Sequence, residues 1–148
     1  MKKMALVVEP DSDLGIIVGW QLARVGYDIY QCTSLHDCLV FLGSHNACLV
    51  AANAFLPDGE FLPAYVNYFQ DRRRTIPPLI TWTSGNEYAP ASYVPVCTGM
   101  LIKILPMPLD VESVGAFGAL YLSQRYEHGF KVRSIRRKCR RCPRIRRR

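Results

Sequence analysis

Hydrophobic positions alternate between two patterns along the first 125 residues. Short apolar or aromatic-rich runs at 4–8, 27–32, 47–53, 79–83 and 100–105 are typical of strands buried in a parallel sheet. Between these runs, apolar residues recur at the three- and four-residue spacing of amphipathic helices. This alternation predicts an α/β domain with a parallel sheet, right-handed crossovers and helices on both faces.

Capping residues mark the limits of the first two predicted helices. Asp11 or Ser12 can cap the first helix, and Gly26 can end it. Ser34 can cap the second helix, which we expect to close at Gly43. The apolar face of the first helix is predicted to contain Leu14, Ile17, Val18, Leu22 and Val25.

The second half of the chain predicts two further helices and two irregular segments. A helix is expected over 60–71, followed by a solvated loop at 72–75. Two prolines interrupt 85–98, so this segment predicts at best a distorted turn or two. Asp110 can cap a last helix, whose two glycines predict close packing against a neighbour: Gly115 and Gly118.

Charge divides the chain into two parts. The formal net charge is +7, yet residues 1–130 contain eight Lys and Arg against twelve Asp and Glu. Residues 131–148 contain eleven Lys and Arg and no acidic residue. We therefore predict an acidic domain at 1–128 and a basic tail at 129–148.

The basic tail is too densely charged to collapse by itself, so we expect it to be disordered when free. Its side chains can neutralise the phosphates of a nucleic acid. Binding to anionic lipid, to an acidic protein or to the acidic domain, and a tail that is not native, are the alternatives. The residues predicted to bind a polyanion are Arg136, Arg137, Lys138, Arg140, Arg141, Arg144, Arg146, Arg147 and Arg148.

Cysteines and hydropathy suggest a compartment. Cys139 and Cys142 form a single CxxC, which supplies at most half of a zinc site, and we predict no metal and no cofactor. The scatter of the other cysteines fits a reducing compartment. The apolar stretch at 4–8 is too short for a signal peptide, and no apolar run is long enough to cross a membrane, so we expect a cytoplasmic protein.

Four motifs resemble those of response-regulator receiver domains of the CheY-like family. They are VVEPDSDL at 7–14, NAFLPDG at 53–59, ITWTSG at 80–85 and ILPMPLD at 104–110, and they occur in the family's order and spacing. The resemblance covers about residues 4–125. It implies a flavodoxin-like fold with five parallel strands in the order 2-1-3-4-5.

The residues that perform phosphotransfer in the family are replaced in this chain. Where the family has its phosphorylated Asp, this sequence has Asn53, an amide that cannot attack a phosphoryl donor. The acidic pair that holds Mg²⁺ becomes Glu9 and Pro10, with Asp11 nearby. The phosphate-pairing Lys becomes Met107.

The family's switch residues are only partly kept. Thr83 occupies the position of the hydroxyl residue, but Ile104 stands where an aromatic residue is usual. Two minor roles stay open. Glu9, Asp11 and Asn53 could gather a weak cation or serve only in helix capping and solvation. Asp58 could be an alternative phosphate acceptor or could support its turn.

The resemblance implies an interaction face. In the family, the region corresponding to 86–125 docks partners or a second receiver, and this chain has candidate anchors there: Tyr88, Tyr93, Ile104, Phe117 and Tyr121. The leading hypothesis is a non-enzymatic, phosphorylation-independent pseudo-receiver that acts through protein contact or as a homodimer. The alternatives are a nucleic-acid-binding regulator anchored by its tail, and a conventional regulator with an unusual acceptor.

Overall fold

The computed structural model describes residues 3–83 and 101–123, and five of its strands form one parallel sheet. The strand order is β2-β1-β3-β6-β7, which confirms the predicted order 2-1-3-4-5. Their limits agree with the predicted runs within two residues at every end. The strands are β1 (Lys3–Val8), β2 (Tyr27–Cys32), β3 (Leu49–Asn53), β6 (Leu79–Thr83) and β7 (Ile102–Pro106).

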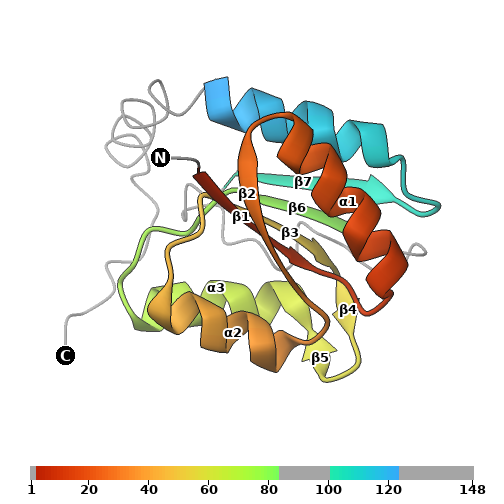
Figure 1. Ribbon diagram of the computed structural model, residues 1–148. Helices are drawn as coiled ribbons and strands as arrows, with labels where there is room; N and C mark the ends of the chain where they lie inside the picture. The colour runs from red at the N-terminus through yellow and green to blue at the C-terminus, as the bar shows by residue number, and fades with distance from the viewer. Residues whose placement is uncertain (1–2, 84–100, 124–148) are drawn as a thin grey trace, which may run out of the picture.

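Helices cover both faces of the sheet, as predicted (Figure 1). One face packs against α1 (Ser12–Arg24) and against the helix at 111–123, which we call the 111–123 helix. The other face packs against α2 (Leu35–Ser44) and α3 (Phe61–Asp71). The three central strands β1, β3 and β6 are therefore mostly buried on both sides, which explains why their sequences are largely apolar.

The helix limits follow the capping residues, with one correction. Asp11 caps α1, and its side chain accepts hydrogen bonds from two backbone N–H groups of the first turn. Ser34 caps α2, and Asp110 caps the 111–123 helix through the N–H of Glu112. The predicted stop at Gly43 is wrong by one residue, because α2 continues to Ser44.

The apolar face of α1 differs from the prediction at one position. Its buried residues are Gly15, Val18, Gly19 and Leu22, whereas Ile17 is exposed. A Cβ at Gly19 would lie 3.3 Å from the Ile29 side chain of β2, so the glycines let α1 approach the sheet closely. The glycines face the sheet, and Ile17 lies on the outer side of α1.

Two segments predicted as plain loops contain more structure. The loop after β3 forms a small antiparallel hairpin, β4 (Phe55–Leu56) with β5 (Gly59–Glu60). After α3, Arg74 is half-buried and donates to the carbonyl of Leu42 at 2.8 Å. Arg72, Arg73 and Thr75 are exposed, as expected of a solvated loop at 72–75, but Arg74 is an exception because it joins the ends of α2 and α3.

The predicted tail and the segment 85–98 lie outside the described residues. The described part of the fold continues at residue 101. Cys32 and Cys38 are buried free thiols and pack in the core as small apolar residues. Among the described helices, none is long and apolar enough to span a membrane.

Candidate functional site

The candidate site lies where β1, β3 and β6 end at the same edge of the sheet. Glu9 follows β1 directly, and Asn53 is the last residue of β3. Asn53 is in register with Trp82 on the neighbouring strand β6. Because these strands are parallel and adjacent, side chains more than 40 residues apart in sequence meet at this edge.

The Glu9 carboxylate is the centre of the site. Its side chain is only 3% exposed. Oε2 accepts a hydrogen bond from the indole N–H of Trp82 at 2.7 Å, and Oε1 accepts from the Asn53 amide at 3.4 Å and from the Asp11 backbone N–H at 3.3 Å. Both carboxylate oxygens are thus bonded to N–H donors of the protein, which is the arrangement a buried carboxylate needs.

The Asn53 side chain is oriented by hydrogen bonds on both sides. Its oxygen accepts from the backbone N–H of Phe55 at 3.0 Å, and its nitrogen donates to Glu9. The amide therefore presents a donor, rather than a negative oxygen, to the carboxylate beside it. An aspartate at this position would place two carboxylates against each other.

Asp11 has a structural role at this edge. One carboxylate oxygen accepts from the backbone N–H groups of Asp13 at 3.0 Å and Leu14 at 3.3 Å. Of the two roles left open for Asp11 in the sequence, helix capping is the one that these contacts support.

The donor set at the site does not fit the divalent cation that a receiver-type fold implies. Mg²⁺ needs free oxygen ligands in octahedral geometry. Here the oxygens of Glu9 already accept N–H donors, and the Asn53 nitrogen faces Glu9. Over residues 3–83 and 101–123, no group of three His, Cys, Asp or Glu side chains is placed to hold a metal ion.

Thr83 and Met107 lie at the same edge. The Thr83 hydroxyl is buried and has no hydrogen-bond partner in the described part of the chain. The backbone N–H of Met107 donates to the Thr83 carbonyl at 3.2 Å, so the loop after β7 is fixed beside β6. The Met107 side chain is 37% exposed and brings no charge to the site.

The predicted interaction face is only partly described. Ile104 is half-buried and packs on the α2 and α3 side of the sheet. Phe117 and Tyr121 are half-buried on the opposite side, and burial raises the pKa of the Tyr121 hydroxyl. Tyr88 and Tyr93 lie outside the described residues, as do all the polyanion-binding residues predicted in the tail.

Asp58 forms hydrogen bonds outside its own turn, which the sequence did not predict. Its two carboxylate oxygens accept from the backbone N–H groups of His36 and Leu35, each at 2.9 Å. These hydrogen bonds lower the pKa of the Asp58 carboxyl. The interpretation of Asp58 as support for its own turn is therefore incomplete, because it ties the hairpin to the N-terminus of α2.

Trp82 belongs to the site although it is not among the residues predicted there. Its indole ring is fully buried, and a buried indole N–H needs an acceptor. The sequence contains one signal for this role. Trp82 is near the end of a predicted strand, and Glu9 directly follows another, so the indole N–H is a donor expected at the same edge as the Glu9 carboxylate. The pairing itself depends on tertiary structure.

Comparisons with solved structures identify the fold. A signal receiver domain from Vibrio parahaemolyticus superposes with a TM-score of 0.73 at 18% identity, over 88% of this chain and 98% of that domain. A CheY-like response-regulator receiver domain protein from Methanospirillum hungatei gives a TM-score of 0.69 at 16% identity, over 86% and 99%. A response-regulator receiver domain from Francisella gives 0.67 at 11% identity, over 83% and 98%.

Sequence comparison gives no match. No protein-family model matches the chain, and no curated protein matches it. The chain therefore has the fold of receiver domains, which the structural likeness establishes, with a sequence far from those of the superposed domains.

Proposed function

We propose that the protein is a pseudo-receiver in signal transduction, which acts by binding other proteins rather than by accepting a phosphoryl group or by catalysis. The observation that carries this proposal is the Glu9 carboxylate bonded to Trp82 and Asn53. In this arrangement, protein N–H groups donate hydrogen bonds to the carboxylate oxygens that would otherwise bind a cation.

The chemistry of the neighbouring residues supports the same conclusion. The Asn53 amide is not a nucleophile toward a phosphoryl donor. Met107 offers no positive charge to a phosphoryl group, and Asp58 is already engaged with the first turn of α2. At this edge, Glu9, Asn53 and Trp82 thus form hydrogen bonds with one another that need neither a phosphoryl group nor a cation.

The test is incubation of the full chain with acetyl phosphate and Mg²⁺, followed by a search for acid-labile phosphate by intact-mass spectrometry. We expect no mass increase, while an ordinary receiver domain in the same assay gains one phosphoryl group. The variants Asp58→Asn and Asp11→Asn would locate any phosphate that does form. Phosphate that disappears in either variant would contradict the proposal and support an unusual acceptor.

Nucleic-acid binding is the second candidate function. It is favoured by one observation on the sequence, namely eleven Lys and Arg without an acidic residue in 131–148. The full chain and a variant with Arg140, Arg141, Arg146, Arg147 and Arg148 replaced by Gln should be titrated with duplex DNA over a salt series. If the tail binds phosphates, log affinity falls with log salt by roughly 0.9 per contact, and the variant shows a shallower slope. Equal, weak binding by both proteins would exclude this function.

A further inference from the structure

The outer face of α1 exposes large apolar side chains. Trp20 is 67% exposed and Ile17 is 40% exposed. They lie on the side of α1 opposite its buried row of Gly15, Val18, Gly19 and Leu22. Neighbouring exposed apolar side chains, one of them a tryptophan, are typical of a surface that binds another protein.

Charged residues flank these apolar side chains in a symmetric order. Asp13, Ile17, Trp20 and Arg24 follow one another at spacings of four, three and four residues, and all four are exposed. Such spacing places them in one row along an α-helix. The row is acidic at its start, basic at its end and apolar between, and it is symmetric about the midpoint between Val18 and Gly19.

This symmetry matches a second copy of the same helix. If two α1 helices pack antiparallel about a twofold axis at that midpoint, Asp13 of each copy faces Arg24 of the other. In the same arrangement, Ile17 of each copy faces Trp20 of the other. A twofold contact brings the same patch of both subunits together, so a self-complementary row is what it requires.

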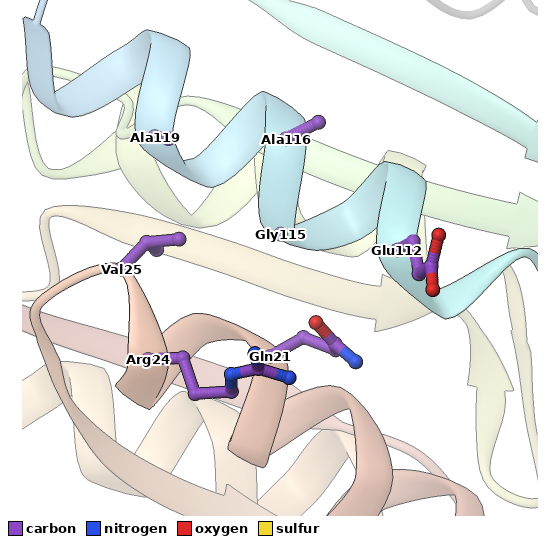
Figure 2. A pocket seen from close by; sticks show the side chains of 7 residues that line it. All are labelled: Gln21, Arg24, Val25, Glu112, Gly115, Ala116 and Ala119. Carbon is purple, nitrogen blue, oxygen red and sulfur yellow. The ribbon is translucent and has the colours of Figure 1, made fainter.

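The surface beside this row leaves room for a partner. One hollow is lined by Ile17, Trp20, Gln21, Ala23 and Arg24. A second hollow lies between α1 and the 111–123 helix (Figure 2), and Gln21 and Arg24 line both. The 111–123 helix lines the second hollow with Glu112, Gly115, Ala116 and Ala119, of which only Glu112 has a long side chain, as Figure 2 shows. A large ring from a second copy can therefore pack beside α1.

We propose that the protein forms a homodimer through antiparallel packing of α1 against α1, with Trp20 and Ile17 at its centre and Asp13–Arg24 ion pairs at both ends. The dimer rests on the proposed contact-based function and specifies its partner and its surface. The two proposals fail separately, because one is tested by phosphate incorporation and the other by self-association.

The first experiment is sedimentation equilibrium on the full chain and two variants, each checked for folding by circular dichroism. Trp20→Glu places a charge at the centre of the contact and should raise the dimer Kd at least about tenfold. Val40→Glu is the matched control, because Val40 is 60% exposed on α2, on the opposite side of the sheet. It should leave the Kd unchanged. A monomeric wild type, or a Kd that Trp20→Glu does not change, would overturn the proposal.

A charge reversal tests the antiparallel register. Asp13→Arg and Arg24→Asp each place like charges opposite each other twice in the dimer, and each should weaken association by about tenfold. The double variant restores opposite charges and should return the Kd to within about twofold of the wild type. Failure of the double variant to recover association would overturn the proposed register, and with it the symmetric dimer.

Tryptophan fluorescence gives an independent measurement. The chain has two tryptophans, of which Trp20 is exposed and Trp82 is fully buried. Dimerisation should therefore protect Trp20 from iodide, so that quenching falls as protein concentration rises through the Kd. Quenching that stays constant while the protein sediments as a dimer would place the contact elsewhere and overturn the proposal.

Discussion

The two faces of the sheet are closed in different ways. On the α2 and α3 side, aromatic rings fill the space, with Tyr65 at 5.0 Å from Phe61 and 5.1 Å from Phe69 between ring centroids. On the α1 side, small residues bring backbones together, and a Cβ on Gly118 would lie 2.6 Å from the Leu22 side chain.

The two sides of the sheet therefore differ in where their large apolar side chains lie. Large core side chains bury much apolar surface in α2 and α3. In α1, two of the four buried residues are glycines, and the large apolar residues Ile17 and Trp20 are exposed. On the α2 side, hydrogen bonds also join Asp58 to the first turn of α2 and Arg74 to its last turn.

The largest effect should come from breaking the Trp82–Glu9 hydrogen bond on the α1 side. Trp82→Phe leaves one oxygen of a buried carboxylate without its donor, and should lower the free energy of unfolding by about 3 kcal/mol. Adding Glu9→Leu removes the unpaired carboxylate. The double variant should therefore lose at least about 1 kcal/mol less than the sum of the losses of the two single variants. Urea denaturation of the four proteins in this cycle is the measurement, and additive losses would contradict the pairing.

A matched pair of glycine variants tests the close approach of the 111–123 helix. Gly118→Ala forces a methyl group against buried Leu22 and should cost about 1–2 kcal/mol, after the gain in helix propensity. Gly115→Ala meets nothing closer than 3.4 Å and should stabilise the protein by about 0.5–1 kcal/mol. Thermal unfolding should therefore show shifts of opposite sign. Shifts of the same sign would mean that crowding does not distinguish the two sites.

The hydrogen bonds of Arg74 on the α2 side can be tested by substitution. Its guanidinium donates to the Leu42 carbonyl at 2.8 Å and to the Asn46 side chain at 2.9 Å. Arg74→Ala should cost about 1 kcal/mol, because the carbonyl at the end of α2 loses its donor. Arg72→Ala is the control, since Arg72 follows α3 directly and contacts Tyr68 of that helix, through a hydrogen bond to its carbonyl at 3.3 Å and by stacking on its ring, without reaching α2. Equal losses in chemical denaturation would argue against a specific role for Arg74.

The smallest effect should come from Asp58 and should depend on pH. A carboxyl whose pKa is lowered by folding stabilises the protein above its unfolded pKa, and this contribution disappears as pH falls through the folded pKa. Asp58→Asn should therefore cost most at neutral pH, and its difference from wild type should vanish in acid. The effect is small because the carboxylate is exposed and screened by solvent.

The measurement is the free energy of unfolding of both proteins from pH 7 to pH 3. Asp71→Asn, which alters an exposed carboxylate at the far end of α3, serves as the control. A difference between Asp58→Asn and wild type that is independent of pH would contradict the assigned hydrogen bonds to α2.

Local pattern determined most of the fold. Runs of apolar residues located all five strands of the sheet, and Asp11, Ser34 and Asp110 marked helix starts, because both features depend on residues close in sequence. The resemblance of four motifs implied the strand order that the structure has. The same motifs identified Asn53 and Glu9 as neighbours at one edge of the sheet.

The tertiary structure alone decided which groups pair across the fold. Trp82 meets Glu9 over 73 residues of sequence, and Arg74 reaches Leu42 over 32. A hydrogen bond of this kind depends on which strands are adjacent and on how deeply each side chain is buried. Local periodicity predicts neither. Ile17 is a similar case: helical spacing predicted it on the core face, but α1 packs on the sheet through Gly15, Val18, Gly19 and Leu22 and leaves Ile17 exposed.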